Sequence, residues 1–182
     1  NDKEFIQELV EKAKVAQKEL ESYTQEEVNA IVKVIAKTVY DNADELAKMA
    51  VEETRMGVYE DKFSKNMGKS KTIYNHIIDK KSVGIIDRDE EKGLVFVAKP
   101  VGVVAAVTPT TNPIVTPMCN SMFALKGANP IIIAPHPRSQ VCSAKTVDLI
   151  NQAIKDQGVK CPENAIQIIR ESTIARTGEL MR

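Results

Sequence analysis

The sequence contains no tryptophan, few aromatic residues and no excess of either charge. Its 25 basic and 25 acidic residues balance, so electrostatics gives no reason to expect a nucleic-acid partner or an anionic membrane surface. No apolar run approaches the roughly 20 residues that cross a bilayer, and no signal-peptide pattern opens the chain. We therefore expect neither a nucleic-acid nor a membrane partner.

Cysteine is also scarce: the three residues, Cys119, Cys142 and Cys161, are widely spaced and form no Cys-x-x-Cys pair. This pattern argues against a disulfide framework or a zinc site and favours a reducing compartment. We expect no bound metal and a cytoplasmic location. The glycine fingerprint GxGxxG of dinucleotide-binding domains is absent as well.

The first 80 residues show the apolar spacing of amphipathic helices. Residues 2–21 are the first predicted helix, and residues 24–27 (TQEE) form a capping box. A helical pattern then continues to Gly57, a candidate C-terminal cap, with a second capping signal at Asn42. A more charged helix is predicted over residues 60–78. The N-terminal part should therefore be a helical layer.

Two short apolar segments, residues 82–87 and 94–99, flank a polar turn at residues 88–93. Their partial alternation predicts a β-hairpin near a sheet edge, whose charged turn would discourage pairing with other chains.

From residue 101 onward, predicted strands and helices alternate. The continuous apolar run at residues 101–107 is typical of a strand buried on both faces. The later elements are a helix at 114–126, a strand at 131–134, a helix at 139–156, a strand at 165–169 and a helix start at 172–173. The βαβαβα order predicts an α/β fold with a parallel sheet, of which three strands make half of a doubly wound domain.

Ligands of open α/β sheets bind at the carboxyl ends of the strands, which makes residues 108–112 the first candidate site. Asn112 could donate a hydrogen bond to an oxyanion formed on a carbonyl substrate. Alternatively, Asn112 and Pro113 could simply begin the next helix, as N-cap and first residue, and local sequence favours this second interpretation. After the second strand, His136 and Arg138 could touch a ribose or phosphate, or could belong to a solvated turn.

Two further features have a simple structural interpretation. Cys119 lies near a helix N-terminus, which would lower a thiol pKa, but its apolar neighbours are typical of a buried thiol, and we do not assign it as a nucleophile. A run of lysines is typical of a solvated helix face: Lys62, Lys65, Lys69 and Lys71.

Residues 98–113 (AKPVGVVAAVTPTTNP) and 131–138 (IIIAPHPR) together resemble the coenzyme A-acylating aldehyde dehydrogenases. Residues 53–62 and 74–81 fit the same group, so the resemblance covers essentially the whole chain. Within it, the sequence is most similar to the clostridial-type branch acting on succinate semialdehyde, followed by the aldehyde domain of bifunctional aldehyde-alcohol dehydrogenases.

The resemblance implies an enzyme that oxidises an aldehyde with NAD or NADP through a thiohemiacetal on a catalytic cysteine. The acyl group then passes to coenzyme A, and the reaction also runs in reverse as acyl-CoA reduction. Expected partners are a small aldehyde and its acyl-CoA, together with further copies of the chain in a dimer or larger homo-oligomer.

By position, Asn112 matches the family's oxyanion-hole asparagine, which reverses the local preference for a helix cap. Lys69 would border the substrate channel, where a cation suits a substrate ending in a carboxylate. Ala134 and Pro137 stand where non-acylating relatives hold the ribose with Lys and Glu, which leaves the choice between NAD and NADP open. The resemblance places Thr108, Pro109, Thr110 and Thr111 along the nicotinamide, and Ala134, Pro135, His136 and Pro137 along the adenosine ribose.

The resemblance also places the catalytic cysteine downstream of residue 182, and none of the three cysteines here matches it. We therefore expect this stretch to be inactive alone. A catalytically inactive nucleotide-binding or assembly module is the alternative. The expected parts are a helical region of the cofactor-binding domain (1–81), a hairpin used in oligomerisation (82–100) and the first half of the nucleotide-binding sheet (101–182).

Overall fold

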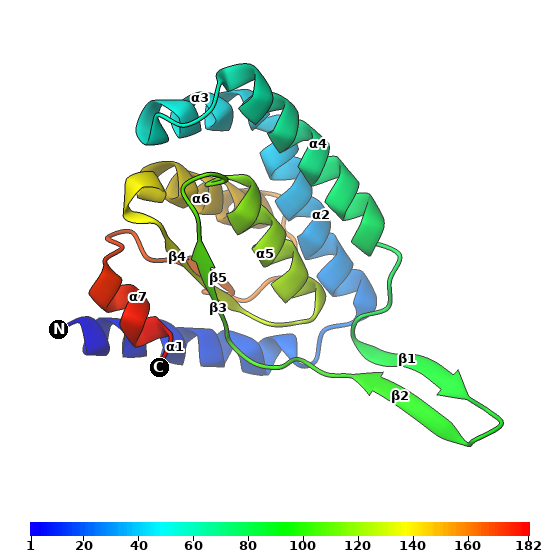
Figure 1. Cartoon of the computed structure of the whole chain (residues 1–182). Coiled ribbons are helices and arrows are strands. Elements are labelled where there is room, and N and C mark those ends of the chain that lie inside the picture. The colour runs from blue at the N-terminus through cyan, green and yellow to red at the C-terminus, as the bar shows by residue number, and fades with distance from the viewer.

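Helices cover both faces of a three-stranded parallel sheet in the computed structural model, which describes all residues 1–182 (Figure 1). The predicted α/β fold class is confirmed. The helices are α1 (Asp2–Leu20), α2 (Gln25–Asp41), α3 (Ala43–Thr54), α4 (Tyr59–Ile77), α5 (Val115–Lys126), α6 (Gln140–Asp156) and α7 (Ile174–Leu180). The strands are β1 (Gly84–Asp89), β2 (Leu94–Ala98), β3 (Val104–Thr108), β4 (Ile131–Pro135) and β5 (Ile166–Ile168), and a 3-10 turn, Pro137–Ser139, precedes α6.

Local capping signals were only partly predictive. The box that begins α2 is confirmed: the N–H of Glu27 donates to Thr24 Oγ1 (3.2 Å) and the N–H of Thr24 donates to Glu27 Oε2 (2.8 Å). Asn42 is the N-cap residue of α3, as predicted, but its side chain makes no capping bond: Nδ2 donates back to the carbonyl of Thr38 in the last turn of α2, which Asn42 also ends. Gly57 does not cap α3 either, since the left-handed residue there is Arg55 (φ 55°).

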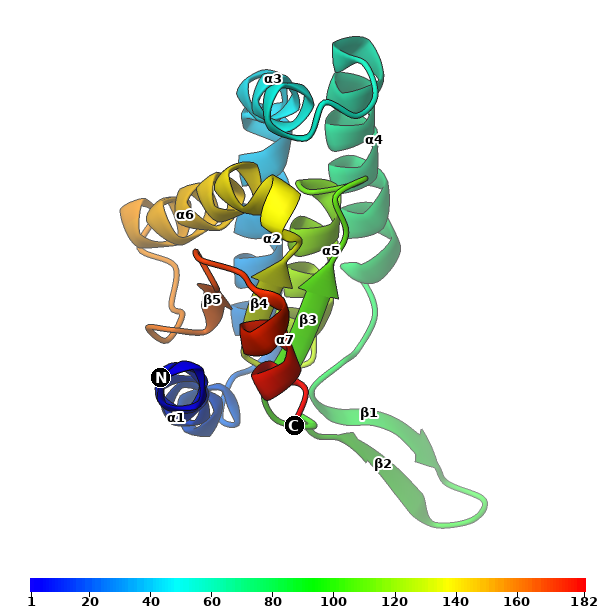
Figure 2. The ribbon, with the colours of Figure 1, turned by 60° about the vertical axis from the view of Figure 1, so that its left-hand side comes forward.

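The hairpin β1–β2 projects away from the helices (Figures 1 and 2). It confirms the predicted hairpin, but its first strand begins two residues later and its turn is shorter. Ser82 is the reason: its N–H donates to Gln25 Oε1 (2.7 Å) and its hydroxyl donates to the carbonyl of Lys126 (2.6 Å), so it binds the helices instead of β2. Five large apolar residues of the hairpin are each about half exposed: Ile85, Leu94, Val95, Phe96 and Val97.

The sheet order is β3-β4-β5 and all strands are parallel. β4 is the middle strand, and its side chains alternate between two cores. Ile131 and Ile133 join the large cluster shared with α2, α5 and α6, whereas Ile132 and Ala134 join a small cluster beneath α1. Figure 2 shows α1 and α7 on one side of the sheet and α5 and α6 on the other, as in a doubly wound fold.

The prediction that the first sheet strand is buried on both faces is wrong. β3 occupies residues 104–108 rather than 101–107, and Ala105 and Val107 are exposed. β3 is an edge strand in this sheet, whereas β4, between two neighbours and two helical layers, is buried along its whole length.

Residues before β3 do not join the sheet because a side chain holds them elsewhere. The N–H groups of Val101 and Gly102 both donate to Asn129 Oδ1 (2.7 and 3.1 Å). The side chain of Val101 is consequently 89% exposed. The other predicted elements begin and end within two residues of their predicted limits.

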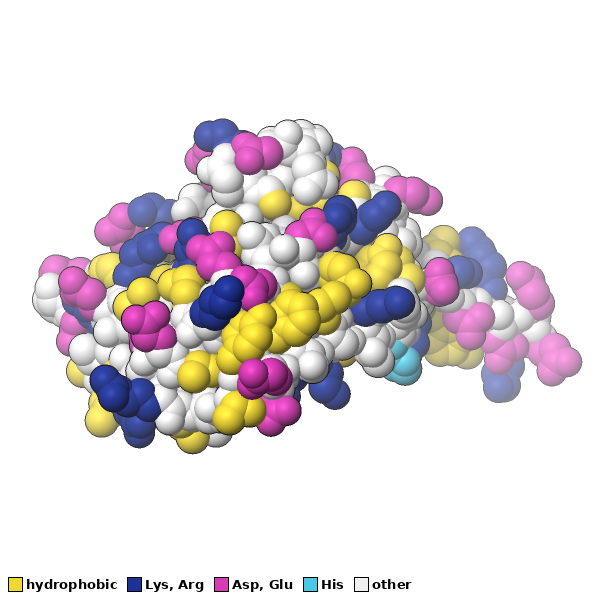
Figure 3. Space-filling model, turned by 90° about the horizontal axis from the view of Figure 1, so that it is seen from above, with side chains coloured by type: hydrophobic (Ala, Val, Ile, Leu, Met, Phe, Trp, Pro, Cys, Tyr) yellow, Lys and Arg dark blue, Asp and Glu magenta, His cyan; other side chains and the backbone are white.

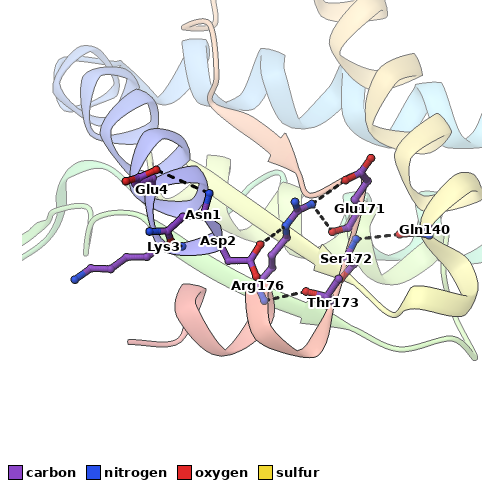
Figure 4. A network of polar contacts seen from close by, with 9 residues as sticks. All are labelled: Asn1, Asp2, Lys3, Glu4, Gln140, Glu171, Ser172, Thr173 and Arg176. Carbon is purple, nitrogen blue, oxygen red and sulfur yellow. Dashed lines mark hydrogen bonds and ion pairs between the residues drawn. The ribbon is translucent and has the colours of Figure 1, made fainter.

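Arg176 of α7 binds both α1 and the segment that precedes α7. Arg176 donates from Nε to Asp2 Oδ1 (3.0 Å) and from Nη1 to the carbonyl of Glu171 (2.8 Å) (Figure 4). Its guanidinium also lies over the ring of Phe5, 4.6 Å from the centroid. The two ends of the described chain therefore pack together.

Candidate functional site

The carboxyl ends of β3 and β4 bring the two predicted cofactor segments together. Thr108, the last residue of β3, pairs with Pro135, the last residue of β4. The N–H of His136 extends this pairing by donating to the carbonyl of Thr108 over 3.1 Å. Residues 108–111 and 134–137 are thus neighbours at one edge of the sheet.

Exposure alternates along the first of these segments. The side chains of Thr108 and Thr110 are 2% and 9% exposed, whereas Pro109 and Thr111 face outward. The buried Thr108 hydroxyl has no hydrogen-bond partner. A buried hydroxyl in this state costs about 1–3 kcal/mol, so a polar group reaching it would be stabilised.

Asn112 does not cap the helix that follows it. The N-cap of α5 is Ile114, which makes no side-chain cap, so the helix-cap interpretation of Asn112 is wrong. Instead, Asn112 Oδ1 accepts a hydrogen bond from Lys65 Nζ over 3.1 Å, and Nδ2 reaches only Thr111 Oγ1, at 3.5 Å. The amide N–H groups therefore retain donor capacity.

The lysines of α4 are not all on a solvated face. Lys62 is 8% exposed and its Nζ donates to the carbonyl of Thr111. Burial, together with the neighbouring Lys65 charge, lowers the pKa of Lys62. Lys65, Lys69 and Lys71 are exposed, as expected for such a run. The structure places Lys62 and Lys65 against the loop of residues 109–113, a contact that the charge pattern did not predict.

The second segment ends at the start of α6. Ala134 and Pro135 are buried, and His136 is exposed, with Nδ1 accepting from the N–H of Arg138 (3.1 Å). Glu53 of α3 accepts from the N–H groups that open α6, at 2.8 and 2.7 Å, which satisfies its free donors. Sequence reasoning did not single out Glu53, because no local signal reveals a cap supplied from 88 residues away.

The cysteines are unsuited to nucleophilic chemistry. All three are free thiols, and Cys119 is 8% exposed among apolar neighbours. Burial raises the pKa of Cys119 to about 11 and that of Cys161 to about 12, and also raises the pKa of Cys142. These thiols are protonated at neutral pH, in agreement with the exclusion of Cys119.

The face of the molecule seen from above shows no concentration of one charge (Figure 3). Acidic and basic side chains are interspersed over the face seen in Figure 3, with hydrophobic groups between them. No three His, Cys, Asp or Glu side chains lie close enough to hold a metal ion. None of the helices combines the length and the apolar character needed to cross a bilayer.

The residues at the sheet edge fit a phosphate-bearing nucleotide. Three exposed polar or cationic side chains lie there: His136, Arg138 and Lys65. The carboxylate of Glu53 is already hydrogen-bonded to the backbone N–H groups that open α6. This donor set suits an anion more than a metal or an apolar ligand.

The family model described as "Aldehyde dehydrogenase family" matches residues 1–181. The chain belongs to the aldehyde dehydrogenase family. Among aldehyde dehydrogenases, succinate-semialdehyde dehydrogenase (acetylating) of Clostridium kluyveri is 59% identical over 97% of this chain and 38% of its own length. The bifunctional aldehyde-alcohol dehydrogenase of Escherichia coli is 39% identical over 95% of this chain and 19% of its own.

Solved aldehyde dehydrogenase structures agree with the fold. An acetylating aldehyde dehydrogenase from Geobacillus thermoglucosidasius gives a TM-score of 0.93 at 40% identity, covering 99% of this chain and 39% of its own. A Rhodopseudomonas palustris propionaldehyde dehydrogenase with bound CoA and an acylated cysteine gives 0.81 at 33% identity, covering 97% and 39%. An engineered glycolyl-CoA reductase with bound NADP+ gives 0.81 at 32% identity, with the same coverage. The chain thus spans about two fifths of the length of each of these three solved structures.

Proposed function

We propose that the protein carrying this chain is a coenzyme A-acylating aldehyde dehydrogenase, which interconverts an aldehyde and its acyl-CoA with NAD or NADP. The observation that carries the proposal is the carboxamide of Asn112, held just beyond the carboxyl end of β3 with its NH₂ group engaged only in one long contact, to Thr111 Oγ1. Similarity to the acetylating relatives supports the same assignment.

In this proposal, Asn112 donates a hydrogen bond to the oxygen of the substrate carbonyl as that oxygen gains negative charge. Residues 108–111 line the nicotinamide, and residues 134–137 line the adenosine ribose. When bound, the nicotinamide supplies the hydride acceptor of the oxidation and coenzyme A supplies the thiol that takes the acyl group. Bound NADP+ and CoA in two similar structures support the use of both groups.

The segment proposed to line the ribose has Ala134 and Pro137 where a lysine and an acidic side chain could hold the ribose hydroxyls. His136 Nδ1 accepts a hydrogen bond from the N–H of Arg138, within the same turn. Few groups therefore grip the ribose, and we infer that both NAD and NADP are accepted. A weak grip is chemically useful, because the reduced cofactor must leave before coenzyme A enters.

The proposal is tested by assaying the full-length enzyme for acyl-CoA-dependent oxidation of NADH and NADPH. Turnover that yields the aldehyde supports the proposal, and binding of NAD(P)H without turnover would favour the alternative, a non-catalytic nucleotide-binding or assembly module. Comparing succinyl-CoA with acetyl-CoA also tests the second candidate, an acetaldehyde-forming part of a bifunctional enzyme, which similarity to the Escherichia coli protein favours. We place the enzyme in the cytoplasm because its thiols are unpaired.

We propose that the preferred substrate is succinate semialdehyde and that Lys69 attracts its carboxylate. Lys69 is exposed on α4, one turn beyond Lys65. Changing Lys69 to Ala in the full-length enzyme is expected to raise KM for succinate semialdehyde by about fivefold, because the binding free energy of one exposed ion pair would be lost. KM for butanal, which has no carboxylate, should not change. Steady-state kinetics with both aldehydes check this, with Lys71→Ala as the matched control. Equal effects on the two aldehydes would contradict it.

We also propose that the β1–β2 hairpin contacts another copy of the chain, because several of its apolar side chains are about half exposed and the hairpin itself projects from the body (Figure 1). Changing Val95 and Val97 to Lys should shift the assembled enzyme toward monomers, since two charges would be buried at the contact. Sedimentation velocity measures the shift. Reversing the charge of Lys92, in the turn, is the control, and an unchanged assembly in the double variant would disprove the contact.

A further inference from the structure

The side chain of Asn112 could present either its oxygen or its nitrogen to a substrate, and only the nitrogen can stabilise an oxyanion. Its neighbour Lys65 decides between them. An ammonium group has three donors and no acceptor, so Lys65 Nζ, 3.1 Å away, can face only the amide oxygen. The amide NH₂ is therefore directed to the opposite side.

A second lysine holds the backbone of the same loop. Lys62, one helical turn before Lys65, donates to the carbonyl of Thr111, the residue preceding Asn112. Gly57 packs on the stem of Lys62: a Cβ there would lie 3.1 Å from Lys62 Cε. The seated Lys62 fixes the position of the loop, and Lys65 fixes the rotation of the carboxamide.

We infer that Lys65 is a positioning residue for catalysis, which holds Asn112 with its N–H groups toward the reacting carbonyl. This inference rests on the proposed function of Asn112. The positive charge adds a second effect, because a cation bonded to the amide oxygen polarises the amide and strengthens its N–H groups as donors. Lys65 itself need not touch the substrate.

The test is a double-mutant cycle in the full-length enzyme, with kcat for acyl-CoA reduction as the readout. Lys65→Met is expected to lower kcat by about tenfold, with KM for NADH and for acyl-CoA unchanged. Lys65→Arg, which keeps a cationic donor, should stay within about twofold of the wild type. Lys71→Met is the matched control, because Lys71 is exposed on the same helix and lines a hollow against α2 that includes no residue of the 109–113 loop.

The decisive measurement is Lys65→Met in an Asn112→Ala background, where it should have no further effect, because the group it positions is absent. The inference would be overturned if the fold-losses in kcat of the two single variants multiplied in the double variant. It would also be overturned if Lys65→Met kept the wild-type kcat while Asn112→Ala lost activity. A fully active Asn112→Ala would instead refute the proposed role of Asn112. The two failures are therefore distinguishable.

Discussion

Replacing Asn112 with alanine in the full-length enzyme is expected to lower kcat for CoA-dependent aldehyde oxidation by about 10²–10³. This is the usual loss when one preorganised oxyanion donor is removed from an active site. KM for the aldehyde should change little, since the hydrogen bond strengthens only as charge develops on the oxygen. The fold should be unaffected, because Asn112 does not cap α5.

Steady-state kinetics in both directions measure this effect. Asn120→Ala is a suitable control, because Asn120 lies on α5 and lines a hollow along β3 that includes none of residues 108–112. An increase in KM at unchanged kcat would show that Asn112 binds the ground state only, and would remove the main support for an oxyanion role.

The second large effect concerns the free energy of unfolding, and it follows from the burial of β4, rather than of the segment before β3, in the core. Ile133→Ala is expected to destabilise the enzyme by about 2–5 kcal/mol, because Ile133 is fully buried in the large core and its removal leaves a cavity. Val101→Ala should change stability by less than about 0.5 kcal/mol, because that side chain is 89% exposed.

Thermal unfolding of the two variants, together with hydrogen exchange in peptides from β4, makes the comparison. Faster exchange in β4 is expected for Ile133→Ala alone. Equal destabilisation by the two substitutions would mean that the segment before β3 is buried in the complete enzyme.

The order of helices and strands was predictable because each element carries its own periodicity and punctuation. The capping box at Thr24 is entirely local, and the alternation after residue 101 is unambiguous. Burial was less predictable, since it depends on which neighbours a segment acquires. The apolar run at 101–107 looks like a central strand, yet a single side chain, Asn129, keeps its first residues out of the sheet.

The candidate site was predictable only in part for a similar reason. Position at a strand end and resemblance to a family pointed to Asn112, but local sequence could not separate a substrate donor from a helix cap. Two lysines bear on it, Lys62 through the carbonyl of Thr111, 49 residues away, and Lys65 through Asn112 itself, 47 residues away. In the sequence both look like members of a solvated lysine run. Only the packing of α4 against the loop identifies them.

The position of α1 has a consequence for how the protein is made. Its apolar residues Ile6 and Ala13 pack against β4, and Gln167 donates to the carbonyl of Leu9, 158 residues earlier in the chain. At about 5–20 residues per second, a ribosome needs on the order of 10 s to supply those partners after α1 has formed. During that interval the apolar side of α1 is uncovered. Helix α1 thus docks only after segments made much later in the chain are available, which makes it a natural target for chaperones that act on nascent chains.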